Sequence, residues 1–199
     1  MNRLERRTGE TRVRVGIGLP EDPASAQGSA AVETGDGFLD HMLETLARYA
    51  GLDVEVAAEG DLHHHLVEDV AITLGRCLQE AAPPRAARYG WAQVPMDEAL
   101  VEAALDLGGR AHYEGELPSD LYEHFLRSFS MNLEATLHTR VLRGRDRHHV
   151  VEGAVKAVGL ALRQALQEGG GVFSTKGSVE WARPGELDAD GGLDRGEAG

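Results

Sequence analysis

The sequence has a single cysteine, Cys77, among its 199 residues. One cysteine cannot form an intrachain disulfide, and it excludes the zinc sites that are built from pairs of cysteines. Cys77 lies in a stretch whose apolar residues have helical spacing, so we interpret it as a buried thiol rather than as a nucleophile. We therefore expect the protein to work in a reducing, cytoplasmic environment.

Long apolar runs and an excess of basic residues are also missing. No run approaches the roughly 20 apolar residues that a membrane span requires, and the polar N-terminus MNRLERRTGE lacks the apolar stretch of a signal peptide. Lysine and arginine number 20 against 33 aspartate and glutamate residues, which gives a net charge of -13. Because phosphate backbones attract cations, we expect neither a nucleic acid nor a membrane as a partner.

What the sequence does contain is an alternation of strand and helix patterns, sufficient for one domain or for two small halves that share a core. The first part predicts a strand at 11–19, a loop at 20–36, a helix at 37–51, a strand at 52–58 and a helix at 64–82. After a loop, the second part predicts strands at 98–107 and 109–117, a helix at 120–131, a strand at 134–143 and a helix at 148–166. The last segment, 180–199, has six acidic residues, two basic residues and five glycines, which favours a solvated acidic tail.

The second part repeats the chemistry of the first. GDLHHHLVEDVAITLG aligns without a gap over GRDRHHVVEGAVKAVG, and upstream DHML aligns with EHFL. The matched pairs are His64 with His148, His65 with His149, Glu68 with Glu152, and His41 with His124. A single His-His-x-x-Glu is a weak signal, but its recurrence with a further histidine on the preceding helix indicates a duplicated half.

These residue types and spacings indicate two metal centres related by pseudo-twofold symmetry. On a helix, His64 and Glu68 are four residues apart and share a face, so both can bind one ion. His65 is rotated by about 100° from His64 and must serve a second ion or a neighbouring chain. Nitrogen and carboxylate ligands without thiolate suit Mn, Fe(II), Co, Ni or Zn, and an open octahedral site favours Mn(II). The unmatched histidines, His63, His112 and His138, are interpreted as ordinary surface or strand residues.

Motifs spread over most of the chain resemble the imidazoleglycerol-phosphate dehydratase family. They are GFLDHML, GDL with HHLVED, ARYG, PMDEAL, LDLGGRAH, EHFLRSF, TLHTRVLRG, HHVVEGAVKA and STKG, which together run from about residue 8 to 179. The resemblance implies an α+β fold of the ribosomal protein S5 domain 2-like type, with two duplicated halves that each form a four-stranded sheet with two helices. We place the first half at 1–92, the second half at 93–179 and the tail at 180–199.

The resemblance also implies a ligand set, a cofactor and an assembly. The matching metal ligands are His41, His64, His65, Glu68, His124, His148, His149 and Glu152. The matching substrate contacts are Glu10, Arg88, Arg110, Lys156, Ser174, Thr175 and Lys176. Two Mn²⁺ ions per subunit and a homo-oligomeric shell of 24 subunits, with manganese between chains, follow from the same match. The connections ahead of His64 and between Arg110 and the helix of His124 are shorter than is usual in the family.

The implied enzyme is a hydro-lyase of L-histidine biosynthesis that converts D-erythro-imidazole-glycerol phosphate to imidazole-acetol phosphate and water. The carbon-bound proton that must leave is not acidic, because no carbonyl adjoins it. The resemblance implies that two metal ions hold the imidazole ring as an imidazolate, which expels the neighbouring hydroxyl. Glu10, Glu68 and Glu152 are the catalytic candidates, and Glu10 or a metal-bound water is the base that takes the proton.

Two other functions fit part of the pattern. A dinuclear hydrolase of phosphate esters would also use two ions and a cationic pocket, but it would have aspartate-rich ligand spacings where histidine dominates here. A metal storage module would need no Arg88, Arg110 or STKG beside the ligands. An assay for imidazole-acetol phosphate against free phosphate separates these alternatives.

Overall fold

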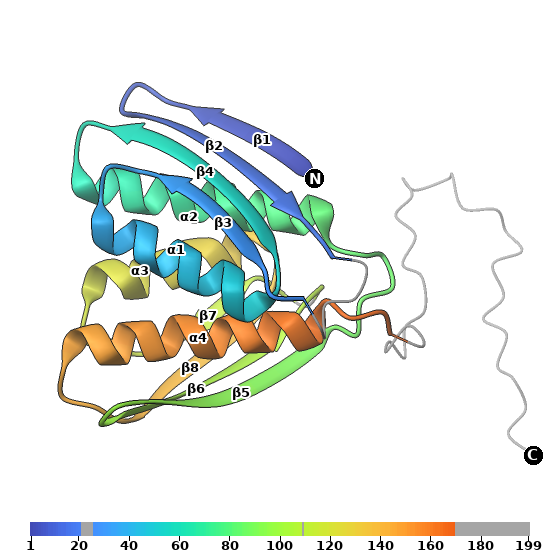
Figure 1. Cartoon of the computed structure of the whole chain (residues 1–199), viewed down its shortest axis with the longest axis vertical. Coiled ribbons are helices and arrows are strands. Elements are labelled where there is room, and N and C mark those ends of the chain that lie inside the picture. The colour runs from blue at the N-terminus through green and yellow to red at the C-terminus, as the bar shows by residue number, and fades with distance from the viewer. Residues whose placement is uncertain (21–25, 109, 170–199) are drawn as a thin grey trace, which may run out of the picture.

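The computed structural model describes residues 1–20, 26–108 and 110–169, whose elements fall into two sets with the same order (Figure 1). The first set is β1 (Asn2–Arg7), β2 (Thr11–Gly18), β3 (Ser29–Glu33), α1 (Gly37–Ala50), β4 (Asp53–Gly60) and α2 (His63–Ala81). The second set is β5 (Tyr89–Met96), β6 (Ala99–Asp106), β7 (His112–Glu114), α3 (Asp120–Asn132), β8 (Thr136–Arg143) and α4 (Arg147–Ala165).

Each set forms a four-stranded sheet with the same topology. The strand orders are β1-β2-β4-β3 and β5-β6-β8-β7. Neighbouring strands are antiparallel, except for the parallel pairs β3–β4 and β7–β8. The predicted α+β fold of two duplicated halves, each a four-stranded sheet with two helices, is confirmed.

The four helices lie between the two sheets (Figure 1). α1 and α2 pack against the first sheet, α3 and α4 pack against the second, and the layers meet where α1 contacts α4 and α2 contacts α3. Buried and exposed side chains alternate along the strands. The side chains that face the helices, such as Val13, Val15 and Leu137, are almost fully buried. The core therefore consists of two sheet–helix layers joined through their helices.

Equivalent glycines allow the helices of the two halves to approach closely. A Cβ on Gly75 of α2 would lie 2.4 Å from the carbonyl oxygen of Phe129 in α3. A Cβ on Gly159 of α4 would lie 2.7 Å from the Cβ of Tyr49 in α1. Both contacts are too short for any larger residue without movement of the helices. The two glycines are the last residues of the repeated segments noted in the sequence. The repeat therefore also includes the positions at which the helices of the two halves pack closely.

Most predicted elements are confirmed, but the assignment of 20–36 as a loop is wrong because it contains β3, an exposed strand of small residues. The patterns also did not locate β1 and β5. Since β5 starts at Tyr89, the boundary expected after residue 92 falls inside a strand of the second sheet. Cys77 is buried, as predicted. In the part of the chain that the structure describes, no helix has the length and apolar character that a membrane crossing requires. The expected tail at 180–199 lies outside the described residues.

Candidate metal centres

Both histidine pairs stand at the start of a helix that follows a tight turn. His64 and His148 are the second residues of α2 and α4. Ahead of α4, Gly144 has a φ of 150°, and a Cβ there would lie 2.3 Å from Cγ2 of Val150. Asp146 then caps the helix by accepting a hydrogen bond from the backbone N–H of His148 at 2.8 Å. The turn therefore delivers two histidines directly onto the first turn of the helix.

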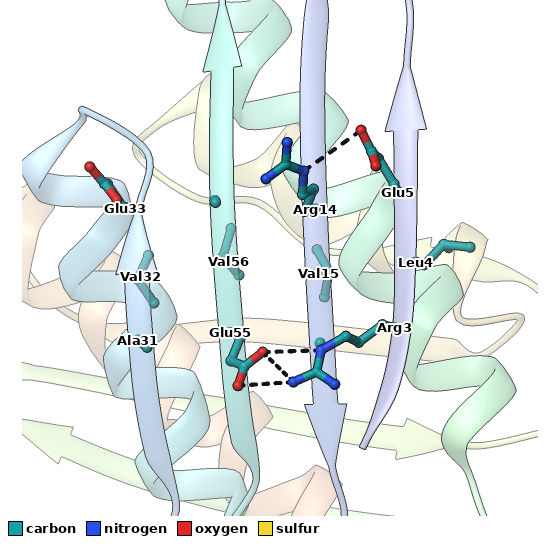
Figure 2. A pocket seen from close by; sticks show the side chains of 12 residues that line it. Arg3, Leu4, Glu5, Arg14, Val15, Ala31, Val32, Glu33, Glu55 and Val56 are labelled. Atoms are coloured by element: carbon teal, nitrogen blue, oxygen red, sulfur yellow. Dashed lines mark hydrogen bonds and ion pairs between the residues drawn. The ribbon is translucent and has the colours of Figure 1, made fainter.

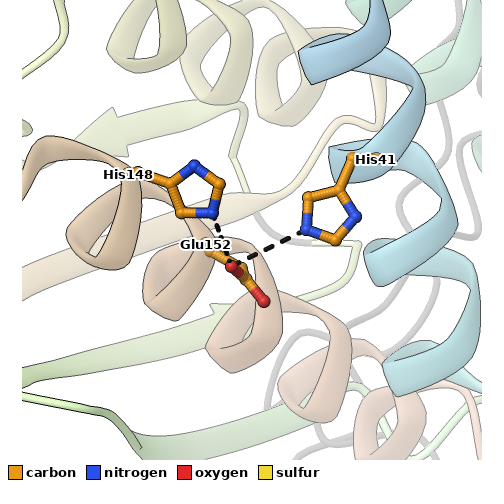
Figure 3. A group of neighbouring side chains, drawn as sticks. All are labelled: His41, His148 and Glu152. Atoms are coloured by element: carbon orange, nitrogen blue, oxygen red, sulfur yellow. Dashed lines mark hydrogen bonds and ion pairs between the residues drawn. The ribbon is translucent and has the colours of Figure 1, made fainter.

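The first group of candidate ligands, which we name the α1/α4 cluster, consists of His41, His148 and Glu152 (Figure 3). The Oε2 atom of Glu152 lies 3.0 Å from Nε2 of His148 and 3.7 Å from Nε2 of His41. The two imidazole rings stack at a centroid distance of 6.0 Å. One histidine comes from the first half of the chain, whereas the other histidine and the glutamate come from the second.

The second group, the α2/α3 cluster, consists of His64, Glu68 and His124. The Nε2 atom of His124 lies 3.2 Å from Oε1 of Glu68, and Nε2 of His64 lies 3.8 Å from Oε2 of Glu68. Here the pair His64 and Glu68 belongs to the first half and His124 to the second. Each cluster is therefore completed across the junction of the two halves, as the contacts α1–α4 and α2–α3 require.

The donor atoms of both clusters fit a divalent metal ion. In each cluster one ligand atom per residue lies within 4.8 Å of the others. The Nε2 atom of His124 is buried and lies 3.2 Å from Oε1 of Glu68, but it forms no hydrogen bond among the described residues. A cation between His124 and Glu68 would satisfy this nitrogen. Two imidazoles with one carboxylate suit Mn, Fe(II) or Zn, and leave positions for further ligands.

Lys156 adjoins the α1/α4 cluster one helical turn beyond Glu152. Its Nζ atom lies 2.8 Å from Oε1 of Glu152 and 5.5 Å from the centroid of the Tyr49 ring. Burial alone would raise the pKa of Glu152, but the hydrogen bond and the charge of Lys156, together with His41 and His148, hold that pKa below its usual value. Glu152 is therefore a carboxylate with one oxygen on the lysine and the other on the two histidines.

His65 and His149, which were predicted as ligands, lie outside both clusters. Nδ1 of His65 is 2.8 Å from Oδ1 of Asp61, and Nδ1 of His149 is 2.7 Å from Oε2 of Glu98. These hydrogen bonds raise the pKa of both histidines. A carboxylate on one ring nitrogen is the usual second contact of a metal-binding histidine, and it orients the other nitrogen.

Glu10, the candidate base, lies in the turn between β1 and β2, with Oε2 at 3.6 Å from Nδ1 of His65. The hydroxyl of Thr8 accepts hydrogen bonds from the backbone N–H of Glu10 at 3.1 Å and of Thr11 at 2.9 Å. The hydroxyl of Thr11 donates in turn to the buried carboxylate of Asp69. Arg6 also binds Asp69, at 2.5 Å. A chain of hydrogen bonds thus ties the turn that carries Glu10 to α2.

Among the other predicted substrate and phosphate contacts, Arg88 and Arg110 lie away from both clusters, unlike Lys156. The backbone N–H of Arg88 donates to the carbonyl of Ala165 at the end of α4, and its guanidinium pairs with Asp106. Since His148 opens the same helix, Arg88 lies about 26 Å from it at a rise of 1.5 Å per residue. The backbone carbonyl of Arg110 accepts a hydrogen bond from the hydroxyl of Thr136, at the same end of the second sheet. Ser174, Thr175 and Lys176 lie outside the described residues.

The remaining histidines make other contacts. Nε2 of His63 pairs with Oδ2 of Asp36 at 2.5 Å. His112 and His138 lie side by side on the outer face of the second sheet, with ring centroids 5.8 Å apart. A depression of about 690 Å³ on the outer face of the first sheet, where Arg3 pairs with Glu55 and Arg14 with Glu5, contains none of the predicted site residues (Figure 2).

Residues that the sequence patterns did not single out are the carboxylates behind the histidines and the buried Asp69. Asp61 stands four residues before His65. This helical spacing would have been detected if the predicted helix had been extended by one turn toward the N-terminus. Glu98 occurs in the PMDEAL motif, and hydrogen bonds from the backbone of Asp146, from His149 and from the backbone of Arg145 lower its pKa to about 2. Its contact with His149 depends on the β5–β6 turn meeting α4, which no local spacing reveals.

The fold and the two clusters define a class of duplicated α+β proteins with candidate metal sites between their halves. Residues 34–162 match the family model described as imidazoleglycerol-phosphate dehydratase. The chain belongs to this family. Curated relatives of that description include one from Desulforamulus reducens, 45% identical over 88% of this chain and 96% of the relative, and one from Clostridium botulinum, 41% identical over the same shares.

Solved structures agree with the sequence relatives. A structure from Pyrococcus furiosus has a TM-score of 0.78 and 37% identity, and the match covers 88% of this chain and 100% of that one. A structure of imidazoleglycerol-phosphate dehydratase from Staphylococcus aureus has a TM-score of 0.71 and 30% identity, over 83% of this chain and 98% of that one. The family predicted from the sequence motifs is confirmed.

Proposed function

We propose that this chain is a hydro-lyase of histidine biosynthesis that removes water from imidazoleglycerol phosphate with the help of two divalent metal ions. Membership of the dehydratase family supports the reaction. The observation that carries the metal dependence is the crossed arrangement of ligands, in which each cluster takes two side chains from one half and one from the other. A structural packing motif would have no need to hold a buried imidazole nitrogen of His124 close to the Glu68 carboxylate without a hydrogen bond to it.

Different residues of the chain have different roles in the proposed reaction. Bound ions would supply Lewis acidity and fix the orientation of the substrate's ring. The hydroxyl next to the ring leaves, and a proton leaves from the next carbon, so that the product enol converts to a ketone. Glu10, in the turn beside His65, is our candidate for the base that accepts that proton, and a metal-bound water is the alternative. Lys156 supplies a cation at the α1/α4 cluster.

We further propose Mn²⁺ as the metal, with two ions per subunit, and a homo-oligomer of 24 subunits as the working assembly. Two features support assembly. His65 and His149 lie outside the clusters of their own chain, as expected of ligands for a neighbouring chain. Arg88 and Arg110 lie at the opposite end of the described part of the chain from the clusters, so one chain does not bring these two contacts to its own ions. A site between copies would bring them together.

A cytoplasmic location is part of the same proposal, in keeping with a biosynthetic family and a reduced, buried Cys77. The decisive experiment supplies purified, manganese-loaded chain with imidazoleglycerol phosphate and follows both imidazole-acetol phosphate and free phosphate. Formation of the ketone without phosphate release is expected. Phosphate release would support the dinuclear hydrolase instead, and no turnover with tightly held metal would support a storage function.

A further inference from the structure

The two clusters repeat the same ligands, but they differ one helical turn beyond the glutamate. In α4 the residue four positions after Glu152 is Lys156, and in α2 the residue four positions after Glu68 is Ile72. Because residues four apart lie on one helical face, both side chains adjoin the glutamate of their cluster. Equal ligand sets are therefore surrounded by different charges.

Lys156 is held in place by three elements. Its Nζ atom lies 2.8 Å from Oε1 of Glu152 in α4, 3.1 Å from the sulfur of Met96 in β5, and 5.5 Å from the ring centroid of Tyr49 in α1. The side chains of Lys156 and Glu152 are only 13% and 9% exposed. Solvent therefore screens the charge of the ammonium less than it would at the surface.

Glu68 has a different environment. Among the described residues its ion-pair partners are His64 and His124, and no lysine or arginine there is paired with it. The side chain of Glu68 is 34% exposed, compared with 9% for Glu152. Both of its carboxylate oxygens face imidazole rings, so both are available to a cation.

We propose that Lys156 makes the α1/α4 cluster bind divalent cations more weakly than the α2/α3 cluster, so that the two ions load in order. The inference rests on the proposed function, since it takes both clusters as metal sites. The ammonium repels a cation placed at Oε2 of the same carboxylate. It also occupies Oε1 and so opposes bidentate ligation by Glu152. Together these effects should weaken the affinity of the α1/α4 cluster by about tenfold.

The test is equilibrium dialysis of the full-length, chelator-stripped chain against increasing Mn²⁺, with bound manganese counted by elemental analysis. The wild-type chain should show two classes of site whose affinities differ by about tenfold. Glu152→Gln should remove the weaker class and Glu68→Gln the tighter class. Lys156→Met keeps most of the length and apolar packing of the side chain without its charge, and it should bring the two classes together. Lys156→Gln serves as a second neutral variant, and circular dichroism confirms folding of each.

Ile72→Lys is the matched control, because it places a lysine four residues after Glu68. It should weaken the tighter class by a similar factor. Equal affinities in the wild-type chain, or unequal classes that persist in both neutral variants of Lys156, would overturn the inference while leaving the metal centres in place. Absence of bound manganese from the wild-type chain would overturn the proposed metal centres themselves.

Discussion

The Nε2 atom of His124 lies 3.2 Å from Oε1 of Glu68, so a histidine of the second half meets a carboxylate of the first. His41 meets Glu152 in the reverse sense, at 3.7 Å. Each ion would therefore be shared between the halves, although the helical spacing places two ligands of each cluster on one helix. This pairing leads to a test that combines substitutions.

Glu68→Gln and His124→Gln should remove the same ion, so the double variant should lose no more manganese than the more severe single variant. Glu68→Gln combined with His41→Gln should instead lose both ions, because these residues belong to different clusters. Elemental analysis after reconstitution with manganese measures the loss. A Glu68→Gln and His124→Gln chain that loses both ions would contradict the pairing.

His63→Ala should leave both ions in place, whereas His64→Ala should empty or weaken the α2/α3 cluster. His63 turns toward Asp36, which caps α1 through the backbone N–H groups of Phe38 and Leu39. Loss of this exposed pair should lower the free energy of unfolding by only about 0.5 kcal/mol. Metal content and thermal unfolding of the two variants provide the comparison. Equal metal loss from both would mean that the ligand register in α2 is shifted by one residue.

Thr11→Val should loosen the turn that carries Glu10. The substitution keeps the volume of the side chain but removes the hydroxyl that binds Asp69 and contacts Thr8. The buried Asp69 then loses one hydrogen bond, which costs about 1–3 kcal/mol of stability. We expect kcat to fall about tenfold with little change in KM, because the candidate base is less well positioned.

Thr11→Ser is the control for this variant, since it keeps the hydroxyl. Steady-state kinetics and thermal unfolding should show it close to the wild-type chain. If kcat falls equally in Thr11→Ser and Thr11→Val, the hydroxyl is not what positions the turn.

Removal of metal at neutral pH should reduce the size of the assembly. His65 and His149 lie outside the clusters of their own chain. If they bind ions that the clusters of a neighbouring chain hold, those ions link the subunits. Size-exclusion chromatography with light scattering, before and after chelation, measures the change. Added Mn²⁺ should restore the large species, whereas Mg²⁺, which prefers oxygen ligands, should not. A monomer under all of these conditions would contradict the proposal.

The helices were predictable because their signals are local. α1 ends where expected, at Gly51 with a φ of 71°, and its buried residues recur at helical spacing. The strands β1, β3 and β5 lack such signals. Arg and Glu side chains dominate β1, small residues make up β3, and β5 contains Gly90 and Pro95. A Cβ on Gly90 would lie 1.8 Å from the carbonyl oxygen of Ala161, so this glycine serves helix packing at the expense of strand propensity.

Six of the eight predicted ligands lie in the two clusters, but the sequence did not predict how they pair. The spacing of His64 and Glu68 predicts one shared helical face, and the structure has both in one cluster. Which histidine joins them depends on α2 packing against α3, a contact that Gly75 permits and that no spacing within the first half encodes. The distance of Arg88 from the clusters was likewise not predictable from residue spacing, because it results from the antiparallel course of the chain through the second half.

A chain of half this length could complete neither cluster alone, because it would carry two ligands on one helix and lack the histidine that faces them. Two such copies related by a twofold axis would complete both clusters at once. The present chain thus has the layout of a symmetric homodimer whose subunits have been joined end to end. Joining makes the association intramolecular, so the filling of both clusters no longer depends on the concentration of separate halves.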